Sequence, residues 1–191
     1  MKITDLCVNA KKIAKNYRLL SVILLVVLTI VIGFLLMVHK QNPEIVTTMD
    51  TLVKLTENIR HNYKNRPDYW GLSTQSVIQK QIVTASMLQN NRLVSPIASE
   101  INVGGDENGS MVMPGTRSFY IALKNLSAKN CVALAIFPLS EKNELGLLSI
   151  TFKVNDKETV FQWGGENSLP VTKERATKIC RKNSIILWNF E

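Results

Sequence analysis

An apolar run of 20 residues without a charge, from Leu19 to Val38, constrains this chain more than any other feature of its sequence. A helix of that length spans about 30 Å, the thickness of the hydrocarbon core of a bilayer. A cleaved secretory signal has a shorter apolar region that ends in small residues, and a buried core helix shows a polar face. We therefore predict a transmembrane helix over residues 19–38, anchored by residues spaced along it: Leu19, Leu24, Val27, Ile30, Phe34 and Val38.

The distribution of charge predicts how this helix is oriented. The chain has 191 residues and a net charge of +8, and residues 1–40 contribute +5 of it, from six basic residues and one aspartate. Basic residues that flank a span mark its cytoplasmic side, so we expect residues 1–18 to be a cytoplasmic tail or leader. The C-terminal part then lies in the periplasm. Because the basic tail suits anionic lipid headgroups, the membrane is the expected partner and nucleic acid is not.

The cysteines fall on both sides of this predicted span. Cys7 would lie in the reducing cytoplasm, whereas Cys131 and Cys180 would lie in the exported part, where disulfides persist. Two exported cysteines allow one intramolecular pair, and the alternative is two buried free thiols. A bridge that closes a loop of about 50 residues contributes roughly 4 kcal/mol in the chain-entropy model.

A second apolar pattern follows the span. Its members recur at helical spacing and predict an amphipathic helix that continues outward over residues 39–66: Ile45, Met49, Leu52, Leu55 and Ile59. Asn42 and Pro43 predict a break near the start of this helix. Pro67 disfavours helical geometry in the residue before it, so the helix should end by Arg66.

Residues 67–191 read as a globular α+β head. Alternating apolar residues predict strands and helical spacing predicts short helices, with a turn at Asn155–Glu158 and a Gly/Asn-rich loop over 102–115. The fold class we expect is a long hydrophobic N-terminal helix that leads into, or packs on, an antiparallel sheet of four strands. The expected elements are helices at 73–88, 127–137 and 169–180 and strands at 116–126, 145–155, 158–163 and 184–190.

Three segments of the chain together resemble the type IVb pilins. "LTENIRHNYKNRPDYWGLSTQSVI" is similar to the place where the pilin helix ends and the head begins. "FYIALKNLSAKNC" is similar to the strand and short helix that carry the first pilin cysteine, and "VTKERATKICRKNSIILWNF" is similar to the pilin C-terminus. The resemblance covers roughly residues 19–191.

The resemblance implies a structural subunit and not a catalyst. In such proteins the N-terminal helices pack into the core of a filament and the heads face outward. The expected partners are therefore other pilin subunits, or proteins of the pilus or secretion machinery, that bind through the N-terminal helix and the head. A Cys131–Cys180 bridge would delimit the variable outer region of the head. No cofactor and no small-molecule substrate is implied.

One departure from the pilin pattern leaves two functions open. Pilins are normally made with a leader that is cut after a glycine, which leaves glutamate at the fifth position. No glycine precedes the span here, and no glutamate lies within Leu19–Val38. The chain is therefore either a minor-pilin-like subunit of a type IV pilus or related filament, or an unprocessed bitopic inner-membrane component. The second kind of protein would bind other parts of a pilus, conjugation or secretion machine through its periplasmic head.

No motif in the sequence predicts a catalytic, cofactor or metal site. "GGDEN", Gly104–Asn108, resembles part of the GGDEF signature of cyclic-dinucleotide synthases but lacks the phenylalanine, so we expect a surface loop. Asp106 and Glu107 are too few to predict a calcium site. His39 and His61 belong to no metal-binding cluster.

Two surface features remain as candidate contacts. Trp70, at the neck of the head, is a possible partner contact. A set of basic residues could line a face for DNA, but acidic residues are interspersed, so we expect a solvated surface. The set comprises Lys124, Lys129, Lys153, Lys157, Lys173, Arg175, Lys178, Arg181 and Lys182.

Overall fold

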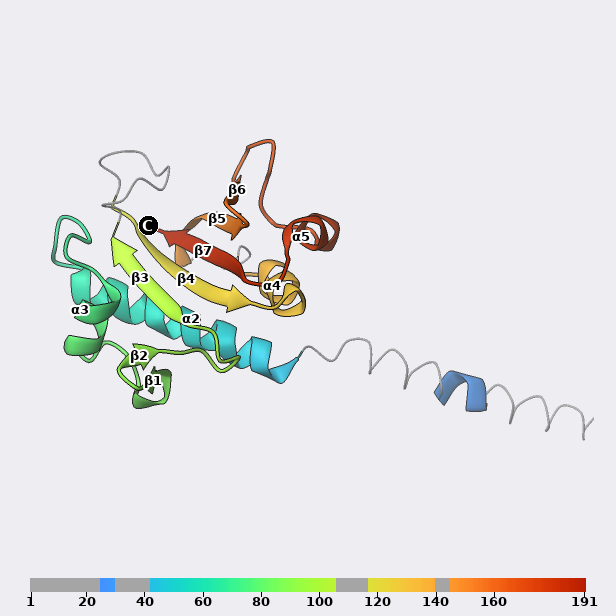
Figure 1. Cartoon of the computed structure of the whole chain (residues 1–191), viewed down its shortest axis with the longest axis horizontal. Coiled ribbons are helices and arrows are strands. Elements are labelled where there is room, and N and C mark those ends of the chain that lie inside the picture. The colour runs from blue at the N-terminus through green and yellow to red at the C-terminus, as the bar shows by residue number, and fades with distance from the viewer. Residues whose placement is uncertain (1–24, 30–41, 106–116, 140–144) are drawn as a thin grey trace, which may run out of the picture. The chain divides into compact units, whose positions relative to one another are not determined.

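The computed structural model of the protein describes residues 25–29, 42–105, 117–139 and 145–191 (Figure 1). The chain divides into two units, Met1–Gln41 and Asn42–Glu191. In the first unit residues 25–29 are helical. The described elements of the second unit are α2 (Pro43–Tyr63), α3 (Thr74–Gln79), the 3-10 turn η1 (Ala85–Met87), β1 (Leu88–Gln89), β2 (Arg92–Leu93), β3 (Ile101–Gly105), β4 (Phe119–Leu126), α4 (Ala128–Ala135), β5 (Leu147–Val154), β6 (Lys157–Gln162), α5 (Lys173–Ile179) and β7 (Ser184–Phe190).

Five of these strands form one antiparallel sheet in the order β3-β4-β7-β5-β6. The last strand of the chain, β7, lies in the middle, where Trp188 pairs with Ile121 of β4 on one side and Ile150 of β5 on the other. The C-terminal strand therefore has a hydrogen-bonded neighbour on each side. The predicted α+β class and antiparallel sheet are confirmed.

The predicted strand count was wrong, because the segment assigned to a Gly-rich loop begins as strand β3. Glycine is needed at these positions because of close packing and not because of a turn. A Cβ atom at Gly104 would lie 2.6 Å from Cζ of Tyr120, the partner of Gly104 on β4, and one at Gly105 would lie 2.5 Å from the carbonyl oxygen of Tyr69. Close approach by a ring and by a backbone therefore selects glycine inside this strand.

The β5–β6 hairpin follows its predicted turn. Val154 pairs with Lys157, and the two residues between them, Asn155 and Asp156, have positive φ of 47° and 64°. Asparagine and aspartate tolerate this left-handed conformation, which suits the twist of a two-residue hairpin.

Helix α2 packs its predicted apolar stripe into the core of the head. Every member of the stripe is at most 4% exposed, while Asp50, Lys54 and Glu57 face solvent. Asn42 is non-helical and its side chain accepts a hydrogen bond from the N–H of Glu44, so α2 starts at Pro43. Figure 1 shows α2 running alongside β3 and β4. The helix and the sheet share one core, whose largest fully buried side chains include Tyr63, Phe119, Phe152, Phe161, Trp188 and Phe190.

The predicted helix over 73–88 was right only in its first half. Ser73 caps α3 through a reciprocal capping box with Ser76. The helix then stops, because Gln81 takes a left-handed φ of 52° and the N–H of Ile82 bonds back to the carbonyl of Val77. This turn buries Ile82, whose carbonyl accepts from the Asn58 amide of α2. Tertiary contact with α2 thus overrides the helical spacing of the following residues.

Candidate functional site

A disulfide joins Cys131 of α4 to Cys180, the residue that caps the C-terminus of α5. Their Cα atoms are 5.7 Å apart, and both side chains are buried. Each helix begins after a side-chain cap: the hydroxyl of Ser127 accepts from the N–H of Asn130, and the hydroxyl of Thr172 accepts from the N–H of Arg175. Helix α5 therefore starts at Lys173, four residues later than the expected range of 169–180. The bond therefore ties a helix that follows β4 to the entry of β7.

The turn between α5 and β7 is held by Arg181 and Ser184. The guanidinium of Arg181 donates to the carbonyl of Thr177 at 3.1 Å and to that of Cys180 at 2.8 Å. The hydroxyl of Ser184 accepts from the N–H of Arg181 and donates to its carbonyl. A cation that pairs with the last carbonyls of a helix also offsets the helix dipole. These hydrogen bonds thus fix the path of the chain from Cys180 to the start of β7.

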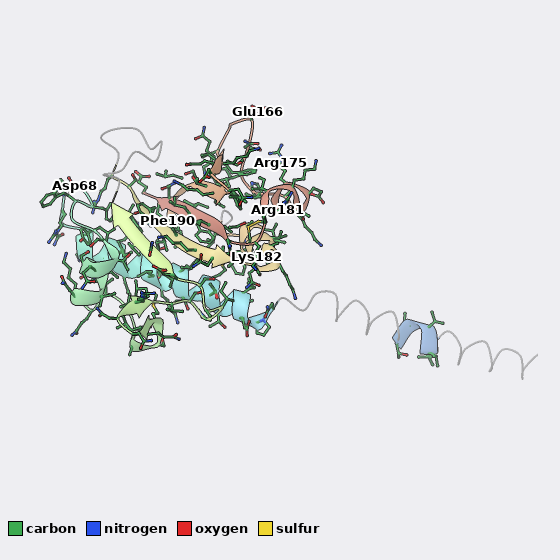
Figure 2. All side chains as sticks on the ribbon, viewed as in Figure 1. Asp68, Glu166, Arg175, Arg181, Lys182 and Phe190 are labelled. Atoms are coloured by element: carbon green, nitrogen blue, oxygen red, sulfur yellow. A yellow bond between two sulfur atoms is a disulfide. The ribbon has the colours of Figure 1, made fainter. Side chains whose placement is uncertain are left out.

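Basic side chains surround this disulfide corner. Lys173, Arg175 and Lys178 are exposed on α5, and Figure 2 labels Arg175, Arg181 and Lys182 at this end of the head. Glu174 is the acid among them. Its own backbone N–H, and next the Thr172 hydroxyl, hold the pKa of Glu174 below its ordinary value. That this face is a solvated surface stays a prediction.

An aromatic ladder connects the end of α2 to the centre of the sheet. Ring centroids are 5.6 Å apart from Tyr63 to Tyr69, 4.6 Å from Tyr69 to Phe119 and 5.5 Å from Phe119 to Phe190. Trp70 follows Tyr69 in the sequence and is 72% exposed. It sits in a tight turn, since its N–H donates to the Asp68 carboxylate. The turn presents an indole to solvent beyond the C-terminal end of α2, and its role as a partner contact stays a prediction.

The predicted anchor falls mostly on residues outside those described. Val27 is helical and 53% exposed. The other predicted anchor residues lie outside the described part of the chain: Leu19, Leu24, Ile30, Phe34 and Val38. Within residues 25–29 and 42–191, apart from the undescribed gaps, no helix is both long and apolar enough to cross a membrane.

The described residues contain no group of three or more His, Cys, Asp and Glu side chains that could hold a metal ion. His61 is exposed on α2. His39, Asp106 and Glu107 lie outside the described part of the chain, as does the remainder of "GGDEN" after β3.

Two arginines that contact the C-terminal end of the chain or of α2 were not predicted from the sequence. The Nε of Arg60 donates to the main-chain oxygen of Glu191 at 2.9 Å. The guanidinium of Arg117 donates to the carbonyl of Tyr63 and lies 5.3 Å from the ring centroid of Tyr69. These partners are far apart in sequence, so no local spacing reveals them. The one sequence pattern that could have drawn attention to either arginine is a cation in the last turn of a helix, and of the two only Arg60 has it.

A long helix packed on an antiparallel sheet, with a disulfide that fastens the central C-terminal strand, defines a pilin-like head. The fold is that of two solved type IV pilins. The type IVb pilin from Salmonella typhi aligns with a TM-score of 0.55 at 17% identity, over 76% of this chain and 98% of that one. TcpA, a type IV pilin from the Vibrio cholerae El Tor biotype, aligns with a TM-score of 0.52 at 10% identity, over 78% of this chain and 100% of that one.

The chain belongs to the bundlin family. The family model described as Bundlin matches residues 39–185, a range that includes α2, strands β3 to β6 and both bridged cysteines. No curated protein matches the chain. The resemblance to type IVb pilins is thereby confirmed, and the family is one of pilus subunits.

Proposed function

We propose that this protein acts as a minor-pilin-like structural subunit in the assembly of a type IV pilus or related filament. The observation that carries the proposal is the Bundlin match across residues 39–185. The head fold supports it, because 76% and 78% of this chain align with the two solved pilins. The proposed partners are other pilin subunits and proteins of the assembly machinery.

The physical basis of the proposal is a helix that suits two environments. Residues 19–38 form an apolar run long enough for a bilayer, in which a stored subunit would be retained. In a filament, bundled copies of the same helix replace lipid contacts with helix–helix contacts. The basic tail holds residues 1–18 on the cytoplasmic side and the head is periplasmic, or extracellular once assembled.

A second candidate role is favoured by the composition of the span. A buried glutamate near the pilin N-terminus is costly unless a neighbouring subunit pairs with it, and Leu19–Val38 contains no glutamate. The second role is therefore a membrane-resident component that binds other parts of a pilus, conjugation or secretion machine through its head. It shares the head surfaces with the first role and differs in never entering a filament.

The experiment that separates the two roles is an intact-mass measurement on the protein from cell membranes and from sheared filaments, with and without the prepilin peptidase. For a pilin subunit we expect a peptidase-dependent loss of mass that corresponds to cleavage near residue 18, and the protein should be present in filaments. Full-length mass in every fraction, with none in filaments, would establish the membrane-resident role and refute the first.

A further inference from the structure

An open pocket of about 340 Å³ lies at the C-terminal end of α2, lined by Arg60, Lys64, Tyr69, Arg117 and Glu191. Arg60 and Lys64 are four residues apart and therefore share a face of the helix. Arg117 comes from the start of the β4 segment and Glu191 from the residue after β7. The lining thus comprises three cationic side chains, one carboxylate side chain and a tyrosine.

Arg117 is held in a fixed position inside this group. One terminal nitrogen donates to the carbonyl of Tyr63, and the guanidinium lies over the ring of Tyr69. Its Nε is buried, and no described residue accepts a hydrogen bond from it. A buried donor without an acceptor is unfavourable, so the described part of the head leaves the hydrogen-bonding capacity of this guanidinium unfilled.

Two cations of the pocket, Lys64 and Arg117, have no carboxylate partner in the described part of the head. Two further cations add to the positive field nearby, since Arg66 and Lys80 lie 4.9 Å and 4.8 Å from the centroid of the Tyr63 ring. Compensation of the helix dipole accounts for cations in the last turn of α2. It does not account for Arg117, which arrives from another element.

We propose that this pocket, the Arg117 pocket, binds a carboxylate side chain from an acidic segment of a partner protein. Arginine forks match the paired oxygens of a carboxylate, and Lys64 adds a mobile charge at the mouth. The aromatic surroundings favour a protein partner: Tyr69 lines the pocket, and the next residue, Trp70, is 72% exposed. Tryptophan and arginine are the residues that most often dominate protein interfaces. The site serves either role considered above and does not depend on filament assembly.

The test uses the full-length protein in non-ionic detergent micelles, titrated with an end-capped hexaglutamate peptide at constant ionic strength. The signals followed are the Nε–H resonance of Arg117 and the indole N–H resonance of Trp70. Both should shift in the wild-type protein, and Lys64→Gln should weaken binding by about tenfold, as expected for the loss of one charge-assisted contact.

The matched control is Lys178→Gln, which removes one exposed lysine from α5. Figure 2 shows Arg181 and Lys182 on the opposite side of the head from Asp68, so this control reports on a separate basic surface. Peptide affinity should be unchanged in Lys178→Gln. Trp70→Ala should weaken binding without lowering the thermal midpoint, which separates a contact from a structural role.

Several results would overturn the proposal. Equal affinity in Lys64→Gln and wild type, or a larger loss in Lys178→Gln, would place peptide binding outside the Arg117 pocket. Inorganic phosphate or an oligothymidylate that shifts the Arg117 resonance at lower concentration than hexaglutamate would make it a phosphate or nucleic-acid site. A shift of that resonance in an Asp106→Asn, Glu107→Gln variant without peptide would show that an acid of this chain occupies the pocket.

Discussion

Removal of the Cys131–Cys180 bridge is the perturbation whose magnitude follows most directly from the structure. The variant replaces both cysteines by alanine, so that neither a free thiol nor an unpaired hydroxyl is left in the core. The two residues are 49 apart in sequence, and in the chain-entropy model closing a loop of about 50 residues is worth roughly 4 kcal/mol. A change of 1 kcal/mol moves the melting midpoint of a domain of about 150 residues by about 2–4 °C. We therefore expect the midpoint to fall by about 8–16 °C.

The assay is a thermal melt of the full-length protein in detergent, followed by near-ultraviolet circular dichroism. Trp188 is fully buried in β7 and supplies a tertiary signal from the strand that the bridge secures. Reductant should lower the midpoint of the wild type to that of the double variant and leave the double variant unchanged. Cys7→Ala is the matched control, because it removes a cysteine that is not part of the Cys131–Cys180 bridge.

A fall of less than about 3 °C in the double variant, or a wild type that is indifferent to reductant, would refute this reasoning. Either result would mean that the sheet pairs β7 with β4 and β5 strongly enough without the cross-link. The entropy of the loop between α4 and α5 would then not limit the stability of the head.

Three further changes test other parts of the molecule. Leu52→Ala empties a buried site on α2 and should cost about 2–5 kcal/mol in a denaturant titration, whereas the exposed neighbour Lys54→Ala should change the free energy of unfolding by less than about 0.5 kcal/mol. The pKa of Glu174 is lowered from 4.5, so the stabilising effect of its carboxylate is present above pH 4.5 and is lost as the pH falls through the lower folded-state pKa. A Glu174→Gln variant should therefore be less stable than the wild type at pH 7 and equally stable at about pH 2. The same difference in stability at both pH values would contradict this prediction. Val27→Asp should weaken insertion by about 3 kcal/mol and reduce the membrane-bound fraction in carbonate extraction, whereas Val27→Leu should remain bound, and full retention of the aspartate variant would count against the anchor.

The elements that the sequence predicted well are those that depend on local chemistry. Ser127 and Thr172 cap their helices because a hydroxyl followed by helix-forming residues needs no distant partner. The β5–β6 hairpin forms at Asn155–Asp156 because those residues tolerate positive φ wherever they occur. Strand β7 was predicted over the range that the structure has, since its apolar residues sit between clear turn residues.

The elements that were missed depend on residues distant in sequence. Gly104 and Gly105 read as loop residues until Tyr120 and the backbone of Tyr69 are placed against them. The chain reverses at Gln81 because the buried Ile82 packs next to α2, which periodicity within 73–88 does not reveal. The same reason hid the candidate site.

The Arg117 pocket could not be predicted from the sequence, because its residues come from distant segments of the chain. Arg60 and Arg117 are separated by 57 positions, and Glu191 follows the last strand, so the group exists only after β7 has paired between β4 and β5. Its most distinctive feature is the buried Nε of Arg117, whose guanidinium contacts the carbonyl of Tyr63 and the ring of Tyr69. Both tyrosines belong to the aromatic ladder.

The central place of β7 links the disulfide to the surfaces proposed for binding. Because β7 is both the last strand in sequence and the middle strand in space, the sheet cannot be completed until the C-terminal segment has been delivered. The bridge at Cys180 lies at one end of this strand, and the contact of Glu191 with Arg60 lies at the other. The strand is therefore fastened at both ends, by a covalent bond at the basic α5 corner and by a hydrogen bond beside the Arg117 pocket. It follows that a loss of order in β7 would disturb the pocket as well as the corner, and that a folded pocket reports a head whose last strand is in place.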